Sequence, residues 1–187
     1  MGSRRLWTRV LIGAILCVAP AHAEVTAPEY HVKAAFIYKF ATYIRWPANA
    51  TTDGNATFVI GILGDDPFGQ ILDEVVRGQN VQGRPISVRR LARPDDARAC
   101  DLLFISSSER GELAEILATL RGTIVLTVSD IDRFAEMGGM IHLLKTGDNH
   151  IHFAINKSAI DRAGLKAPSQ LLRLARIVDP LPDGGKP

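Results

Sequence analysis

Three groups of polar side chains in this sequence have the residue types that binding or catalysis requires. The first is Gly64 and Asp65, which follow an apolar run and precede an amphipathic one. Backbone N–H groups in a turn of this kind can hold a phosphate at a helix N-terminus. The spacing lacks the third glycine of a dinucleotide-binding fingerprint and the Gly-Lys-Ser/Thr of a P-loop. We therefore interpret the pair first as a turn with a helix N-cap, and second as one wall of a small-ligand pocket.

The second group is the serine run that begins with Ser106 and Ser107, at the end of a predicted buried strand. Open α/β sheets bind ligands beyond the carboxyl ends of their strands, so these serines are the other wall of the candidate pocket. A nucleophilic serine would need a Gly-x-Ser-x-Gly elbow and a partner that orients a base, and the sequence shows neither. Helix capping by the serines is the simpler interpretation, and a hydrolase is the weakest alternative.

The third group contains histidines and arginines near the C-terminus. His150 and His152 lie in a predicted β-hairpin, and Arg173 and Arg176 lie in a predicted C-terminal helix. Arginine beside apolar residues is typical of surfaces that recognise a partner protein or an anion. These four side chains are therefore the candidate partner contacts, against the alternative of a solvated surface.

A metal site at the hairpin is not expected. If Lys145 pairs with His150, then His150 and His152 share one face of the hairpin while His142 points to the other. Ligands on opposite faces do not converge on one ion. The aspartate pairs elsewhere in the chain start or precede predicted helices, where carboxylates favour the positive end of the helix dipole. The sequence predicts no bound metal and no cofactor.

An N-terminal export signal precedes the elements that would position these groups. Residues 1–23 begin with a basic segment and continue with an apolar stretch at 10–18, which is too short to span a bilayer. Small residues match a signal-peptidase site, so cleavage is predicted between Ala23 and Glu24. The mature chain is expected in the periplasm. Loss of three arginines would change the formal net charge from +2 to −1 and leave Cys100 as the only cysteine.

The composition is that of a globular protein. The chain is 47% hydrophobic and 22% charged, which excludes disorder as the main state. The near-neutral charge argues against nucleic acid as a partner, because that binding depends on neutralising phosphates. Two cysteines are too few for a disulfide scaffold or a four-cysteine zinc site. We predict one α/β domain over 24–180 and a flexible tail over 181–187.

Apolar periodicity predicts an alternation of strands and helices along the domain. Continuous apolar runs predict buried strands, and a spacing of three to four residues predicts helices. Strands are expected over 58–63, 86–91, 101–105, 123–128, 140–145 and 150–156. Helices are expected over 29–46, 68–76, 109–120, 129–138, 157–163 and 168–178. This order predicts a single-layer mixed sheet, mainly parallel, flanked by helices, with a C-terminal β-hairpin and helices.

Several segments, in this order, resemble the YfiR-like (HmsC-like) family of periplasmic proteins. The resemblance covers about residues 30–178, and its specificity comes from the ordered set rather than from any one segment. The segments are VKAAFIYKF at 32–40, WP at 46–47, ILGDDPFG at 62–69, GRPI at 83–86, CDLLFIS at 100–106, LTVS at 126–129, GGMI at 138–141, IHFAIN at 151–156 and LLRLA at 171–175.

The resemblance implies a non-enzymatic α/β regulator. The best-understood members repress a membrane-anchored diguanylate cyclase by binding its periplasmic portion, and an OmpA-like outer-membrane lipoprotein can sequester the repressor. Release raises cyclic di-GMP and promotes biofilm formation. The resemblance also implies dimers, and it leaves open whether the partner of this chain is a cyclase or a sensor histidine kinase.

Cys100 marks a departure from the family pattern. Relatives often carry paired cysteines, for which redox control has been proposed, and Cys100 matches one such position. The expected mature chain has no second cysteine, so an intrachain disulfide switch is excluded. The leading hypothesis is repression by binding, and the alternative is a periplasmic small-ligand sensor that uses Gly64, Asp65, Ser106 and Ser107.

Overall fold

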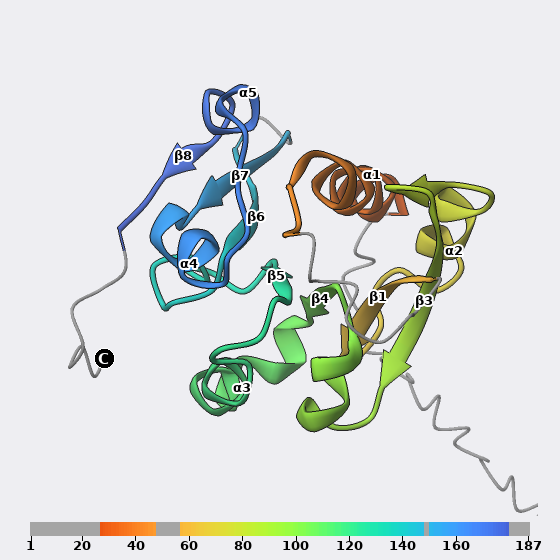
Figure 1. Cartoon of the computed structure of the whole chain (residues 1–187), viewed down its shortest axis with the longest axis horizontal. Helices are drawn as coiled ribbons and strands as arrows, with labels where there is room; N and C mark the ends of the chain where they lie inside the picture. Colours follow the sequence, from red (N-terminus) through yellow and green to blue (C-terminus); the bar gives the residue numbers. More distant parts are fainter. Residues whose placement is uncertain (1–26, 48–56, 148–149, 180–187) are drawn as a thin grey trace, which may run out of the picture.

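The computed structural model of the chain describes residues 27–47, 57–147 and 150–179. The predicted cleavage site between Ala23 and Glu24 and the tail 181–187 lie outside the described residues. The described residues form one eight-stranded sheet with helices packed against it (Figure 1).

The sheet is mixed and mainly parallel, which confirms the predicted α/β fold class. Its strands are β1 (Phe58–Leu63), β2 (Asn80–Val81), β3 (Arg84–Leu91), β4 (Leu102–Ile105), β5 (Leu126–Ser129), β6 (Ile141–Lys145), β7 (Ile151–Ile155) and β8 (Arg176–Ile177). They lie side by side in the order β2-β3-β1-β4-β5-β6-β7-β8. The pairs β2–β3 and β6–β7 are antiparallel, and the other neighbouring pairs are parallel.

Helices cover both faces of the central strands. α1 (Ala27–Tyr43) and α2 (Ile71–Val76) contribute to one core, and the 3-10 helix η2 (Pro94–Ala99) and α3 (Leu113–Thr119) contribute to the other. Figure 1 shows α1 and α3 on opposite sides of the sheet. The 3-10 helix η3 (Ser107–Gly111) leads into α3, while α4 (Lys157–Arg162) and α5 (Ser169–Leu172) follow the hairpin. Every residue of β1, β4 and β5 is buried, which explains why these strands lack polar alternation.

The predicted C-terminal helix over 168–178 is wrong in its second half. Helix α5 ends at Leu172, and after a turn the chain forms β8, which pairs in parallel with β7. The N–H of Val178 donates to the carbonyl of Ile155 at 3.0 Å. The open edge of β7 therefore supplies hydrogen bonds that a helix would have made within itself, and Arg176 lies on a strand rather than on a helix.

The short helix predicted over 129–138 is a series of turns instead. Arg133 has a φ of 60°, which lies in the left-handed region and interrupts any helix. The ring of Phe134 packs so closely on Gly139 that a Cβ there would lie 2.2 Å from the ring. The apolar spacing of this segment reflects burial of Phe134 beneath the sheet, not helical periodicity.

The hairpin forms as predicted, but its register differs by one residue from the expected pairing. Lys145 pairs with Ile151 rather than with His150, and His150 accepts a backbone hydrogen bond from Thr146 at 3.0 Å. A shift of one residue moves every side chain of one strand to the opposite face. His142 and His152 therefore share a face, which corrects the expectation that they point apart.

A buried ion pair ties the starts of three strands together. The carboxylate of Asp101, just before β4, accepts bonds of 2.7 and 3.0 Å from the Arg84 guanidinium at the start of β3. It also accepts a 2.8 Å bond from the N–H of Val59 in β1. Arg84 in turn donates to the carbonyl of Thr57 at 2.6 Å. One carboxylate thus fixes the relative positions of β1, β3 and β4 at their amino ends.

Replacing Asp101 with alanine should lower the free energy of unfolding by about 3 kcal/mol, because it leaves the largely buried Arg84 without its counter-charge. Urea unfolding followed by circular dichroism measures the loss. Asp96→Ala is the matched control, since it breaks a pair with Arg93 that solvent screens. Equal losses in the two variants would contradict the role given to the Arg84–Asp101 pair.

Candidate functional site

The sheet has a topological switch point between β1 and β4. After β1 the chain goes to β3 on one side of it, and then returns to form β4 on the other side. Open α/β sheets bind ligands beyond the carboxyl ends of the strands at such a point. Gly64 and Asp65 follow β1 there, and Ser106 and Ser107 follow β4. The structure therefore brings together the two walls of the pocket that the sequence suggests.

An open pocket of about 450 Å³ lies at this place. Its lining residues are Tyr30, Asp65, Asp66, Pro67, Ser106, Ser107 and Ser108. Gly64 does not line the pocket but makes it possible, because its φ of +86° and its missing Cβ admit the Ser108 hydroxyl. That hydroxyl accepts a 3.0 Å bond from the N–H of Asp65, which joins the two loops.

Ser106 has the capping role expected from the sequence. Its hydroxyl accepts from the N–H of Ser108 at the start of η3, which is the geometry of a helix N-cap. Asp66 is likewise engaged, since it accepts a 2.9 Å bond from Arg90 of β3. Local bonds thus hold the side chains of Asp66, Ser106 and Ser108 in the wall of the pocket.

A charged cluster of Glu29, Tyr30, Lys33, Asp130 and Lys145 holds α1 beside this pocket. Lys33 is only 4% exposed and lies 2.7 Å from both Glu29 and Asp130. The Tyr30 hydroxyl donates to Asp130 at 2.9 Å, and Lys145 lies 3.0 Å from Glu29. Sequence reasoning missed this cluster, although a lysine within the apolar stripe of the predicted first helix was a signal for it.

The cluster shifts the pKa values of Tyr30 and Glu29. Burial, together with the negative charge of Asp130, raises the pKa of Tyr30, so that its hydroxyl remains a donor. Burial by itself would raise the pKa of Glu29, but the hydrogen bonds from Lys33 and Lys145 outweigh it and hold that pKa below its ordinary value. The Tyr30 hydroxyl is therefore protonated and the Glu29 carboxylate ionised at neutral pH.

A second candidate surface lies at the edge of the sheet that β8 forms. We call Arg173, Leu174, Arg176 and Ile177 the C-terminal patch; all four side chains are exposed, Leu174 at 75% and Ile177 at 49%. Arg176 is held by Glu136 at 2.8 Å.

Of the two histidines predicted as partner contacts, only His152 lies on the same face of the sheet as a residue of the C-terminal patch. His152 and Arg176 share a face, because Ala154 of β7 pairs with Arg176. His150 is exposed beyond the end of β7.

His142 lies under this edge in a row with Ala154 and Arg176 across three strands. Its ring is 4% exposed, and neither its Nδ1 nor the Glu136 Oε2 atom has a hydrogen-bond partner. Burial lowers the pKa of His142, and the positive charge of Arg176 acts in the same direction, while Glu136 and Asp132 oppose them. The described residues contain no group of three His, Cys, Asp or Glu side chains placed to hold a metal ion.

Cys100 is sealed inside the protein. Its thiol packs against Gly61 of β1 so closely that a Cβ at residue 61 would lie 2.7 Å from the sulfur. Burial raises the pKa of the thiol to about 11, so almost none of it is thiolate at neutral pH. Cys100 is consequently a packing residue in this fold.

Comparison with known proteins places these features in context. A sequence model of the YfiR/HmsC-like family matches residues 30–176. In the described parts of the chain, no helix combines the length and the apolar character needed to cross a bilayer.

Two solved structures share the fold. One is a conserved domain protein from Vibrio cholerae O1 biovar El Tor strain N16961, with 12% identity, a TM-score of 0.50, and coverage of 64% of this chain and 54% of that one. The other is an ABC domain from Streptococcus pneumoniae in complex with L-Trp, with 11% identity, a TM-score of 0.54, and coverage of 78% and 60%. This chain therefore spans less than two thirds of either protein, and at these identities the likeness shows the fold alone.

The buried His142 should make stability depend on pH. Its pKa is lower in the folded chain than its ordinary value of 6.5, so the unfolded chain binds the proton first as the pH falls. The contribution of this group to the free energy of unfolding should thus be constant above about pH 7 and decline below 6.5. Urea unfolding at a series of pH values should show a shallower decline in His142→Gln. The exposed His152→Gln is the control, and equal slopes in wild type and His142→Gln would refute the assignment.

Proposed function

The chain belongs to the YfiR/HmsC-like family, and from that premise we propose that it is a non-enzymatic periplasmic regulator that acts by binding. Its target is the periplasmic part of an inner-membrane signalling protein, either a diguanylate cyclase or a sensor histidine kinase. Binding holds a cyclase inactive and so lowers cyclic di-GMP and biofilm output. The further partners that follow from the family are an OmpA-like outer-membrane lipoprotein and a second copy of this chain.

The observation that carries this proposal is the C-terminal patch. It exposes two aliphatic side chains next to two arginines within five consecutive residues, at the edge of the sheet. Single exposed aliphatic residues are common on soluble proteins, but arginine is enriched at protein interfaces and the buried centre of an interface is apolar. In this protein the segment 173–177 supplies both the arginines and the apolar area.

The two arginines differ in how they are prepared for binding. The guanidinium of Arg176 is oriented by Glu136, so less conformational freedom is lost when a partner contacts it. Arg173 lies at the end of α5 and has no carboxylate partner among the described residues. A partner with an acidic group can therefore pair with Arg173 while apolar side chains cover Leu174 and Ile177.

Repression by binding requires a difference in affinity. The regulator must bind the inactive conformation of its target more tightly than the active one, because equal affinity for both shifts no equilibrium. The patch therefore has to recognise a surface that the target displays in only one of its two states.

Substituting Leu174→Asp together with Ile177→Asp should weaken target binding by roughly tenfold or more, because charges then enter an interface that excludes water. Each variant is expressed from the full sequence in a deletion strain, and cyclic di-GMP is measured. Wild type should restore low cyclic di-GMP and the double variant should not.

Intact-mass spectrometry of the product checks that the mature chain begins at Glu24.

Val32→Asp is the matched control, because Val32 is 43% exposed but lies on α1, away from β8. It should restore repression. Full repression by the Leu174→Asp/Ile177→Asp chain would contradict the assignment of the patch. Unchanged cyclic di-GMP in the deletion strain would contradict the proposed function when the target is a cyclase.

A second function is supported by the pocket at the switch point. Tyr30, Asp65, Ser106 and Ser107 offer hydroxyls and a carboxylate at the place where this fold binds ligands. The carboxylate of Asp65 favours an ammonium group over a phosphate, whereas the carboxylate of Asp66 is already paired with Arg90. One protein of similar fold was solved in complex with L-Trp, so an amino acid is the ligand class to test first.

A thermal-shift screen of the purified chain with amino acids tests this second function. A ligand present at 100 times its Kd should stabilise the fold by about 2.7 kcal/mol. Asp65→Asn should remove the response, because its carboxylate would pair with the ammonium group. Asp95→Asn, at an exposed position in η2, should retain the response. No stabilisation by any amino acid at millimolar concentration would exclude this ligand class.

A further inference from the structure

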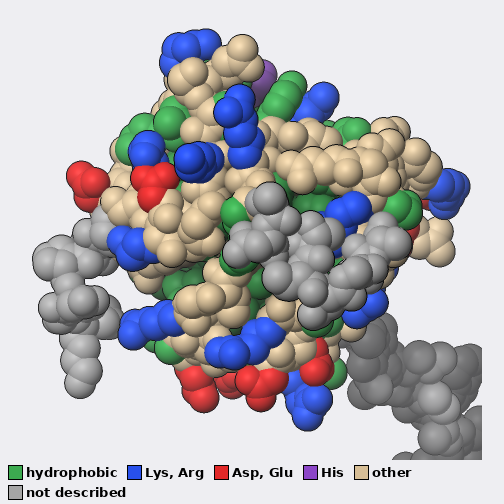
Figure 2. Space-filling view, in the orientation of Figure 1, with side chains coloured by type: hydrophobic (Ala, Val, Ile, Leu, Met, Phe, Trp, Pro, Cys, Tyr) green, Lys and Arg blue, Asp and Glu red, His purple; other side chains and the backbone are tan. Residues whose placement is uncertain are grey.

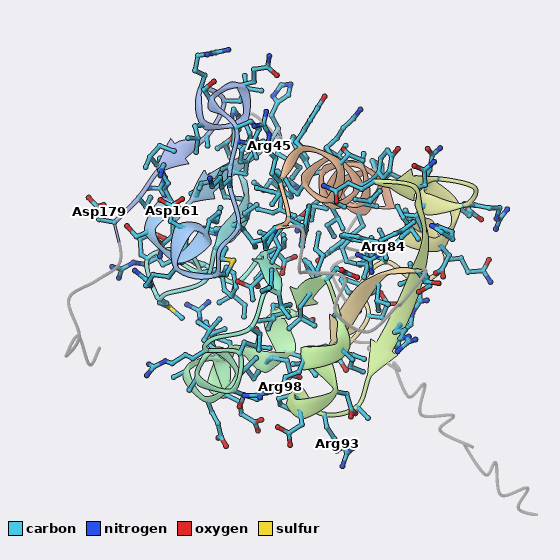
Figure 3. All side chains as sticks on the ribbon, in the orientation of Figure 1. Arg45, Arg84, Arg93, Arg98, Asp161 and Asp179 are labelled. Carbon is cyan, nitrogen blue, oxygen red and sulfur yellow. The ribbon has the colours of Figure 1, made fainter. Side chains whose placement is uncertain are left out.

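Two cations are held side by side where the end of α1 meets the segment between α4 and α5. Arg45 and Lys166 form an isolated antiparallel bridge, outside every strand of the sheet. Each N–H donates to the carbonyl of the other residue, at 3.0 and 3.1 Å. In such a directly opposed pair the two side chains point to the same side of the backbone ladder. Figure 3 shows Arg45 at the end of α1, beside the chain that leads into α5.

The residues around the bridge hold it rigidly in place. Ile44 and Leu165, which precede the two cations, are each 1% exposed, and Trp46 is 9% exposed; all three belong to the core beneath α1. Arg45 and Lys166 are themselves exposed. The buried neighbours therefore anchor both strands of the bridge and turn the two charges outward.

This arrangement has an electrostatic cost that nothing in the described chain offsets. Like charges directly opposite each other on a ladder repel. Elsewhere, Lys33, Arg84 and Arg90 each lie within 3.0 Å of a carboxylate, whereas no ion pair joins Arg45 or Lys166 to any described acid. Figure 2 shows Lys and Arg side chains gathered over α5 and the end of α1 on this face. The repulsion is relieved when an anion binds between the two side chains.

We propose that Arg45 and Lys166 form a binding site for a phosphate group, either free phosphate or the headgroup of an anionic phospholipid. A phosphate with a charge between −1 and −2 matches two cations, whereas one carboxylate leaves a positive charge unmatched. The planar guanidinium binds two phosphate oxygens at once, and the lysine ammonium acts as a point charge on a third. This site is separate from the C-terminal patch and from the pocket at the switch point, and it does not depend on the proposed function.

Thermal unfolding of the purified chain in inorganic phosphate and in chloride, at equal ionic strength and pH, tests the site. Phosphate should raise the melting temperature of the wild type in a saturable way. Arg45→Gln with Lys166→Gln should weaken the apparent affinity for phosphate about tenfold or abolish it. Lys166→Glu should also abolish the response, and it should melt higher than wild type in chloride, because it places a carboxylate opposite Arg45.

The matched control is Arg110→Gln with Arg121→Gln, which removes the same charge from exposed positions near the two ends of α3. It should keep the phosphate response. If the control weakens the response as much as Arg45→Gln with Lys166→Gln does, or if the latter leaves it intact, the site is wrong.

Sedimentation with vesicles distinguishes the two sources of phosphate. Binding to phosphatidylglycerol vesicles but not to phosphatidylcholine vesicles, lost in Arg45→Gln with Lys166→Gln, identifies a lipid headgroup. A response to inorganic phosphate without vesicle binding identifies a free anion. Absence of both responses overturns the proposal. Tighter binding of a hexaglutamate peptide than of phosphate at Arg45 and Lys166 also overturns it, because the occupant would then be an acidic protein segment.

Discussion

A lysine in the interior determines where α1, the longest helix among the described residues, lies. Charged groups are costly to bury unless they are paired, so the buried Lys33 of α1 needs Asp130 from outside the helix in addition to Glu29 one turn earlier. Asp130 follows the carboxyl end of β5, and Lys145 at the end of β6 completes the cluster through Glu29. The requirement to neutralise one ammonium group thus draws the first turns of α1 to the carboxyl ends of β5 and β6 and brings Tyr30 to the rim of the pocket.

The sheet and the pocket could be predicted because both follow from local patterns and one general rule. The apolar runs of β1, β4 and β5 are continuous, and only burial on both faces requires that. Parallel strands end at a common edge, so the segments after β1 and β4 had to meet there. The sequence alone therefore predicts that Asp65 and Ser107 lie close together.

The remaining features depend on contacts between distant segments, which a local pattern does not contain. The spacing at 168–178 is compatible with a helix, and only the open edge of β7 turns Arg176 into a strand residue. The register of β6 on β7 is set between the two strands, and a difference of one residue decides whether His142 and His152 lie on the same face of the hairpin. Asp101 and Arg84 are ordinary exposed types by sequence, and their pairing appears only when β1, β3 and β4 are assembled.

The contact between Gly61 and Cys100 has an evolutionary consequence. Neither residue can be enlarged alone, because the sulfur already occupies the space that a side chain at position 61 would need. Related sequences that carry a bulkier residue at position 61 should therefore carry a smaller one at position 100, so that the two positions change together. The glycine in the middle of a buried strand is thus explained by the sulfur of Cys100, which packs on it from the end of η2, rather than by any need for backbone flexibility.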